Sequence, residues 1–216
     1  MPGRDDVLAV LARSVFGVLP GADLRKLSAI VLPTRLPVGR LVYDPQLGIV
    51  LAGSVRAFVA GASGHQLTVW YLRPGDSLGL ARLAGRHFPT AFQALVDTWM
   101  FNLGDDRFAE FRAAHPALGW AAANELGARL DEVEAELTRV AFASLRQRLA
   151  YHLLALAHEH SGDPVHQAQL AASVGSVREV IGRTLAQMRH DGLVDVGPTG
   201  VVVTDAECLR REAEAG

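Results

Sequence analysis

The 216-residue chain has few cysteines, no long apolar run and no excess of positive charge. Its single cysteine, Cys208, excludes an internal disulfide and cannot supply the four thiolates that an iron–sulfur cluster normally takes. No apolar run reaches the roughly 20 residues that a membrane-spanning helix needs. The N-terminal stretch is interrupted by charge and lacks the layout of a signal peptide. We therefore expect a cytoplasmic protein that does not enter a membrane.

The charge balance is unlike that of a generic nucleic-acid-binding protein. The net charge is −2 at pH 7, and within residues 141–216 seven arginines stand against nine carboxylates. Any DNA binding must therefore depend on where individual arginines lie, and nonspecific binding should be weak at physiological salt. The composition, 50% hydrophobic and 20% charged, indicates an ordered globular protein.

Residues 165–203 are predicted to form two helices, a tight turn and a β-hairpin, which is the outline of a winged helix-turn-helix. Gly175 tolerates the positive φ with which the short first helix can end. The second helix is expected over residues 177–191, and a four-residue turn at 197–200 separates the hairpin strands. At about 100° per residue, the second helix gathers its apolar residues in one arc and leaves the neighbouring arc free. The apolar arc consists of Ile181, Leu185 and Met188.

The free arc carries Arg-Glu-Val-Ile-Gly-Arg from position 178. This run resembles the R-E-x-x-G-R recognition-helix signature of the Crp/Fnr family of bacterial transcription regulators. The resemblance implies that Arg178 donates to a guanine, Glu179 accepts from cytosine N4, and Arg183 contacts a second guanine. Gly182 is costly inside a helix unless the backbone must approach a partner closely, so it too is predicted to lie at the DNA.

Between residues 31 and 103 the hydrophobic pattern changes to short runs separated by turn residues, which is typical of a β-barrel or jelly roll. Residues 53–56 (GSVR) and 70–76 (WYLRPGD), followed by Gly79, resemble the strand pattern of cyclic-nucleotide-binding β-rolls. Such a roll senses small molecules. Strands are predicted at residues 41–43, 49–60, 66–72, 91–96 and 99–103.

A long helix is expected after Pro116. Its apolar residues are spaced 3, 4, 3, 4, 3, which is an a/d heptad seam, and the family uses this helix to dimerise. A two-fold dimer would place two recognition helices about 34 Å apart on a palindromic DNA site. The alternative is a helix packed only on its own domain. The seam residues are Ala123, Leu126, Leu130, Val133, Leu137 and Val140.

The whole chain is thus expected to be an α+β protein in three parts. Residues 1–115 form a cyclic-nucleotide-binding-like β-roll, residues 116–140 a dimerisation helix, and residues 141–216 a winged helix-turn-helix domain. The expected function is a dimeric, sequence-specific transcription regulator that reads a palindromic TGTGA-like site, and not an enzyme. Its partners would be double-stranded DNA, a second copy of the chain and, by the family resemblance, RNA polymerase.

The predicted effector pocket departs from that of the cyclic-AMP-responsive members. Those members hold the ribose with a Glu and the cyclic phosphate with an Arg, whereas Leu80 and Pro89 stand at these positions here. A phosphate bound without its arginine would be a poorly paired charge. Arg82 or Arg86 could replace that arginine, so a cyclic-nucleotide-responsive regulator stays an alternative. The pocket residues are Gly79, Leu80, Thr90, Ala91, Val133 and Glu134.

Other sensing or enzymatic chemistries find little support in the residues. Haem is an alternative because some relatives bind it through a histidine in this region and an N-terminal proline, and the chain has His87 and Pro2. The single cysteine excludes the iron–sulfur sensing of the Fnr branch. A cupin-like metalloenzyme is a remote alternative, because no ligand cluster lies on the predicted strands. We therefore expect no resident metal, no cofactor and no catalytic residues, with cyclic nucleotide or haem as the open exceptions.

Overall fold

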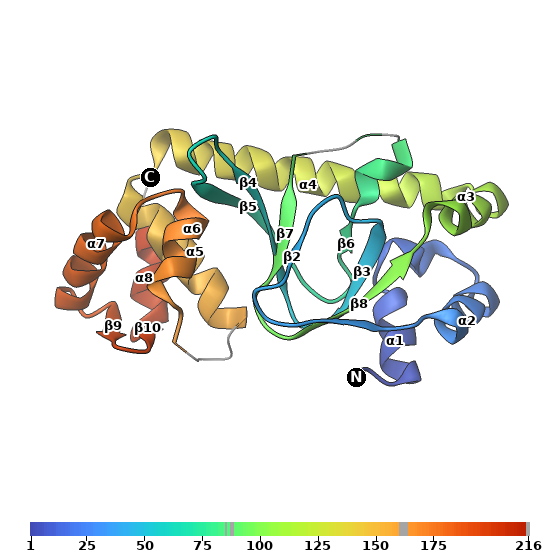
Figure 1. Cartoon of the computed structure of the whole chain (residues 1–216), viewed down its shortest axis with the longest axis horizontal. Coiled ribbons are helices and arrows are strands. Elements are labelled where there is room, and N and C mark those ends of the chain that lie inside the picture. The colour runs from blue at the N-terminus through green and yellow to red at the C-terminus, as the bar shows by residue number, and fades with distance from the viewer. Residues whose placement is uncertain (85, 87–88, 160–163, 215–216) are drawn as a thin grey trace. The chain divides into compact units, whose positions relative to one another are not determined.

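The computed structural model describes residues 1–84, 86, 89–159 and 164–214. The chain forms two compact units, Met1–Ala57 with Trp70–Val133 and Phe58–Val69 with Glu134–Gly216 (Figure 1). The predicted α+β class is confirmed, with β-sheets toward the N-terminus, one long helix, and a largely helical C-terminal part. The division between the two units falls inside the long helix and does not set that helix apart as a segment of its own.

The first unit contains most of the strands between residues 34 and 103, together with the helices that pack on them. Apolar side chains from helices and strands form one buried core, in which the rings of Phe16 and Phe108 meet edge to face with centroids 6.2 Å apart. Complete burial of such apolar side chains contributes about 1.5–3 kcal/mol each. The helical elements are α1 (Arg4–Leu11), η1 (Val15–Val18), α2 (Gly21–Ile30), η2 (Leu80–Ala84), α3 (Asp105–Ala114) and α4 (Ala117–Phe142), and α4 continues into the second unit.

Among the described residues, two four-stranded sheets form the roll, with strand orders β1-β8-β3-β6 and β2-β7-β4-β5. The pairs β1–β8, β3–β8, β3–β6 and β2–β7 are antiparallel, as a jelly roll requires. The strands are β1 (Thr34–Leu36), β2 (Leu41–Val42), β3 (Leu47–Ala52), β4 (Val55–Ala60), β5 (Gln66–Leu72), β6 (Ser77–Leu78), β7 (Ala91–Ala94) and β8 (Thr98–Leu103).

One predicted strand is wrong. The run expected at residues 49–60 is two strands, β3 and β4, separated at Gly53, where φ is 86°. A Cβ atom at this position would lie 2.7 Å from the backbone oxygen of Asp97 and from Oγ1 of Thr98. Only glycine combines this left-handed backbone with such a close approach of the neighbouring chain. The glycine therefore turns the chain from one sheet to the other.

The second unit is built on helices with a short hairpin. Its core is formed by fully buried leucines of α5 and α6 together with the apolar arc of α7, and the β4–β5 hairpin reaches it through a bridge between Leu67 and Val174. The elements are α5 (Leu145–Glu159), α6 (Gln167–Val174), α7 (Arg178–His190), β9 (Val194–Gly197), β10 (Gly200–Val203) and α8 (Ala206–Glu214). Of the helices that the structure describes, none combines the length and the apolar character needed to cross a bilayer.

Candidate nucleic-acid interface

The helices α6 and α7 are joined by a turn of three residues, 175–177. Gly175 ends α6 with φ 66° and ψ 33°, and its N–H donates to the carbonyl of Ala171. Val177, in extended conformation, is the N-cap of α7 and gives it no side-chain cap hydrogen bond. The left-handed glycine ends α6 and changes the direction of the chain, so that α7 can begin after only three residues. The predicted helix-turn-helix is confirmed.

The inward face of α7 is the apolar arc predicted from the sequence. Ile181, Leu185 and Met188 each have no exposed surface. Leu170 and Val174 of α6, the helix that contacts α7, are almost completely buried as well. Because three consecutive turns of α7 are anchored in this way, the direction in which its outer face points is fixed by the core of the second unit.

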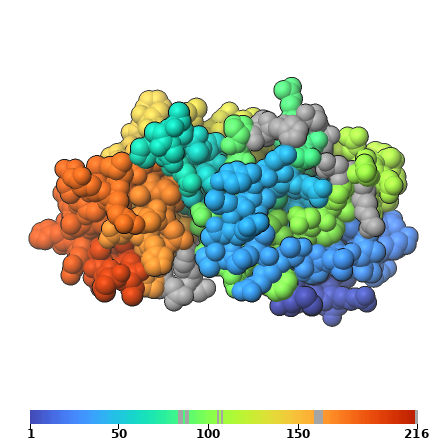
Figure 2. Space-filling view, in the orientation of Figure 1, coloured from blue at the N-terminus to red at the C-terminus, as the bar shows by residue number. Residues whose placement is uncertain are grey.

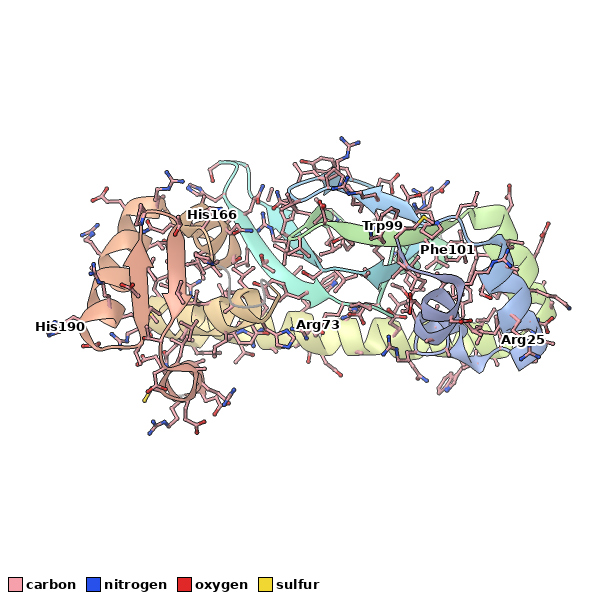
Figure 3. All side chains as sticks on the ribbon, turned by 90° about the horizontal axis from the view of Figure 1, so that it is seen from below. Arg25, Arg73, Trp99, Phe101, His166 and His190 are labelled. Carbon is pink, nitrogen blue, oxygen red and sulfur yellow. The ribbon has the colours of Figure 1, made fainter. Side chains whose placement is uncertain are left out.

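The outward face of α7 carries the predicted DNA-contacting residues. Arg178, Glu179 and Arg183 are exposed, and the side chains of Glu179 and Arg183 have 83% and 73% of their surface free. One oxygen of Glu179 lies 3.4 Å from Nη2 of Arg183, one helical turn away. An exposed pair of this kind contributes only about 0–1 kcal/mol. Both groups are therefore available to an external partner, and His190 at the end of the helix also projects outward (Figure 3).

Gly182 lies between these groups on the surface of α7. A Cβ atom built at this position meets no atom of the protein within 4 Å. The fold therefore does not require glycine here, although glycine costs a helix interior roughly 1 kcal/mol relative to alanine. The predicted close approach of DNA to Gly182 is therefore compatible with the space around this residue.

The strands β9 and β10 form the wing beside α7. Their register pairs Gly197 with Gly200, so the loop consists of Pro198 and Thr199 alone. Residues 197–200 therefore form the predicted four-residue turn, and its two glycines are also the last paired residues of the strands. Gly200 has φ 147°, and a Cβ atom there would lie 2.7 Å from the carbonyl oxygen of Val165. In the space-filling view, the segment from α6 onward, orange to red, is a continuous exposed surface (Figure 2).

An arginine of α5 holds the far end of α7. Arg146 donates through Nη1 to Asp191, the C-cap residue of α7, at 2.7 Å, and its Nε lies 3.0 Å from Glu212 of α8. Burial opposes the charge of Arg146, but the hydrogen bonds to Glu212 and Asp191 outweigh it and raise the pKa of the guanidinium. Helix α8 thus shares one cation with the C-terminal end of α7.

A buried polar cluster joins α4 to α5 within the second unit. Glu136 and His152 are only 2% and 1% exposed. Arg139 donates to Glu136 at 2.8 Å and lies over the ring of Tyr151 at 3.8 Å from its centroid. Only part of this cluster could be recognised in the sequence. The i,i+3 spacing of Glu136 and Arg139 was a signal for their ion pair, but nothing local indicated that a histidine of α5 completes it.

The predicted effector pocket residues have different environments. Gly79 has φ 73°, and Leu80 is 5% exposed and belongs to the hydrophobic core of the first unit. Thr90 is half-buried and Ala91 is buried. Val133, half-buried, ends the first unit, while Glu134, exposed, begins the second. Leu80, at the position of the family's ribose-binding Glu, is therefore part of the packing.

The two arginines considered as phosphate ligands also differ. Arg82 lies 2.7 Å from a carboxylate oxygen of Asp44 and so has a protein counter-ion, whereas Arg86 is exposed. His87, the candidate haem ligand, lies outside the described residues. Within the described part of the chain, no group of three or more His, Cys, Asp or Glu side chains is placed to hold a metal ion.

The predicted seam on α4 is largely open to solvent in the single chain. Leu130, Leu137 and Val140 are 58%, 66% and 39% exposed, and Ala123 is exposed as well. Leu126 is half-buried and packs against the core of the first unit. The exposed apolar side chains of the seam are therefore fewer than the full heptad pattern predicts.

Comparisons with known proteins agree with this arrangement. The sequence model of the Crp-like helix-turn-helix domain matches residues 147–212. The chain is 30% identical over 185 residues to the cyclic AMP receptor protein of Thermus thermophilus, covering 82% of this chain and 86% of that one. It is also 30% identical over 174 residues to the transcriptional regulator SdrP of the same species, covering 77% and 83%.

Solved structures show the same fold. A transcriptional regulator of the CRP/FNR family from Thermus thermophilus matches with a TM-score of 0.72 and 26% identity, covering 85% of this chain and 98% of that one. A regulator of the same family from Eubacterium rectale matches with a TM-score of 0.80, covering 93% and 97%, and at 18% identity this likeness concerns the fold alone. Three of these four relatives are named as transcription regulators.

Proposed function

The chain belongs to the Crp/Fnr family of bacterial transcription regulators, and from this premise we propose that it binds a palindromic, TGTGA-like DNA site as a homodimer. The observation that carries the proposal is the division of α7 into two faces. One face, with Ile181, Leu185 and Met188, is completely buried, while Arg178, Glu179 and Arg183 are exposed on the other. A helix anchored on one side and charged on the other suits insertion into a major groove.

The exposed side chains match the chemistry of base edges. The two-pronged guanidinium of Arg178 fits O6 and N7 of guanine, and Arg183 can contact a second guanine. Glu179 would be repelled by phosphates, so its place on this face makes sense if it accepts from the amino group of cytosine. Gly182, with open space above it, would let the DNA approach the helix backbone. Because the chain has no excess of positive charge, these few contacts must provide most of the affinity.

Dimerisation is supported by the apolar line on α4. Leu130 and Leu137 are more than half exposed, one heptad apart, and exposed leucines at this spacing are the pattern of a coiled-coil seam. In a dimer with a two-fold axis, the apolar line of each copy would cover that of the other. The two recognition helices of such a dimer explain why the site should be a palindrome.

The effector is proposed to be atypical or absent. Some relatives bear names that refer to cyclic AMP, which is the reason to weigh this ligand. Two observations speak against it: Leu80 is packed in the core instead of offering a carboxylate, and Arg82 is paired with Asp44. A cyclic phosphate would have to compete with that carboxylate or depend on the exposed Arg86. By analogy with the family, we also propose RNA polymerase as a partner and the cytoplasm as the compartment.

A binding-site selection tests the proposal. Wild-type protein, Arg178→Ala, Glu179→Ala and the control Arg210→Ala, which removes an exposed arginine from α8, are each used to select sequences from a random DNA pool. Wild type and control should select the same palindrome. The α7 variants should lose preference at one guanine or one cytosine of each half-site, a discrimination of about 1–3 kcal/mol. If both α7 variants select the wild-type sequence, these residues do not read bases.

A further inference from the structure

The corner between β5 and β6 is hydrogen-bonded to α4 inside the first unit. Both carboxylate oxygens of Glu125 are used: Oε1 accepts from the backbone N–H of Ser77 at 2.7 Å, and Oε2 accepts from its hydroxyl at 2.8 Å. Ser77 is 6% exposed, and the Glu125 side chain is 16% exposed. A bidentate carboxylate with two short bonds fixes both the position and the rotation of the group it binds.

A second contact joins the same two elements. Nη2 of Arg129, one turn after Glu125 on α4, lies 2.7 Å from a carboxylate oxygen of Asp76, and Nη1 lies 2.8 Å from Glu132. Burial opposes the charge of Arg129, but Asp76 and Glu132 outweigh it and raise the pKa of the guanidinium. Asp76 also accepts from the backbone N–H of Arg73 at 2.7 Å. The turn at residues 73–76 and helix α4 are thus connected through one carboxylate.

The corner that Glu125 and Arg129 hold lies directly before the predicted effector pocket in the chain. Ser77 and Leu78 form β6, and the next residues are Gly79 and Leu80, with which the predicted effector pocket begins. On its other side, α4 carries the exposed leucines of the proposed dimer seam. The same helix therefore holds the sensor corner through Glu125 and Arg129 and presents the surface on which the dimer depends.

The charge of the cluster limits what could bind at this corner. Three carboxylates, those of Asp76, Glu125 and Glu132, lie within 4 Å of the guanidinium of Arg129. An anionic ligand at the corner would therefore be repelled by these carboxylates, and it would have to displace Glu125 to reach the N–H of Ser77. The carboxylate of Glu125 already accepts the hydrogen bonds of Ser77 that such a ligand would need.

We infer that Glu125 is a positioning residue that acts as a built-in ligand of the β5–β6 corner, so that α4 holds its DNA-binding arrangement without a small molecule. This inference rests on the proposed function and adds to it the residue that replaces the effector. Ser77 is the residue that Glu125 binds, and the ion pair between Arg129 and Asp76 is a second contact between the corner and α4. Breaking the pair loosens the corner from α4 and lowers affinity for DNA while leaving the reading face of α7 unchanged.

Glu125→Gln tests the inference in the full-length chain, with Asp131→Asn as control. Glutamine keeps the shape of the side chain but loses the negative charge and one acceptor oxygen. Asp131 is an exposed carboxylate on the same helix, so its substitution makes the same change in net charge. Affinity is measured by fluorescence anisotropy on the DNA site that the wild type selects, with and without cyclic AMP as the probe ligand. Hydrogen exchange of residues 73–80 is measured in parallel.

The expected results separate the variant from its control. Wild type and Asp131→Asn should bind the site equally, and cyclic AMP should not change their affinity. Glu125→Gln should bind at least about tenfold more weakly, with faster exchange at the corner and an unchanged dimer mass. If Glu125→Gln does not fold, Ser77→Ala is used in its place, and a smaller loss of DNA affinity is expected. Its control is Ser63→Ala, which removes an exposed hydroxyl from the β4–β5 hairpin.

Three outcomes overturn the inference, and they differ from one another. If Glu125→Gln binds DNA as tightly as Asp131→Asn, the pair does not set affinity, although the proposed function stands. If the wild type binds only after cyclic AMP is added, a small molecule is required and Glu125 does not replace it. If the wild type selects no DNA sequence at all, the proposed function fails and this inference fails with it.

Discussion

The Nε2 atom of His152 lies 3.5 Å from the Oε1 atom of Glu136, and both side chains are almost completely buried. The other oxygen of Glu136 accepts from Arg139 at 2.8 Å. Burial lowers the pKa of His152; Glu136 acts in the opposite direction, while Arg139 and Arg148 add to the lowering. The imidazole is therefore neutral near pH 7, between a carboxylate and two guanidinium groups at the junction of α4 and α5.

Acid should destabilise the protein through His152. The unfolded imidazole takes up a proton around its ordinary pKa of 6.5 and the folded one only at lower pH, so the unfolded state binds more protons in this interval. The stabilisation is complete above pH 6.5 and is lost as the pH falls through the folded pKa. Between about pH 7.5 and about pH 5.5, wild type should lose more unfolding free energy than His152→Gln, by at most about 1.4 kcal/mol per pH unit.

Urea denaturation at both pH values provides this measurement. His152→Gln keeps a polar group beside Glu136 but does not titrate. All other acidic and basic groups are shared by the two proteins, so their contributions cancel in the comparison. An equal loss of stability in wild type and variant would contradict the assignment of this pH dependence to His152.

Gly182→Ala should make the protein more stable and a poorer DNA binder. A methyl group at this position meets nothing in the fold, and alanine is favoured over glycine in a helix by up to about 1 kcal/mol. Thermal unfolding should therefore shift upward while affinity for the selected DNA site falls. Gly119→Ala is the control, because Gly119 also lies in a helix with no atom within 4 Å, but on α4. A tighter DNA complex with Gly182→Ala would show that the open space is not used by DNA.

Leu137→Glu should convert the dimer to a monomer. Leu137 is 66% exposed in the single chain, so the substitution leaves the fold of the protomer intact and places a charge in the proposed seam. Native mass spectrometry reports the change in mass. Ala135→Glu, an exposed position on another side of α4, should remain dimeric. A dimer that survives Leu137→Glu would place the two-fold contact elsewhere.

Gly200→Ala should destabilise the wing, whereas Gly197→Ala should be tolerated. Gly200 has φ 147°, and its added Cβ atom would lie 2.7 Å from a backbone oxygen, which cannot move aside easily. The strain should cost about 1–3 kcal/mol. At Gly197 the nearest atom is 4.0 Å away, and φ is not in the left-handed region. Circular dichroism melting curves of the two variants should therefore diverge, and coincident curves would refute the strain at Gly200.

The recognition helix could be predicted because its information is local. The apolar arc of Ile181, Leu185 and Met188 repeats with the helical period, and the R-E-x-x-G-R signature lies within one and a half turns. Gly175 likewise marks the end of α6 by a backbone conformation that few other residues adopt. Such features do not depend on where the rest of the chain lies, so the sequence alone contained them.

The polar clusters could not be predicted because their partners are distant in the sequence. Ser77 and Glu125 are 48 residues apart, and the side chains of Glu136 and His152 meet only once α4 and α5 have packed. Each of these residues is a polar type that is common on protein surfaces, so none of them by itself predicts a buried contact. The division of the 49–60 run at Gly53 was missed for a related reason, since the close approach that demands glycine comes from Asp97 and Thr98 on another part of the chain.

The exposed pair between Glu179 and Arg183 has a consequence for the rate of DNA recognition. Both side chains are more than two-thirds exposed, and opening such a pair costs at most about 1 kcal/mol, which slows a step by no more than about fivefold. Breaking its ion pair with Glu179 should therefore slow the approach of Arg183 to a base only slightly. The lifetime of the complex, and not the speed of its formation, should then distinguish a correct site from a mismatched one.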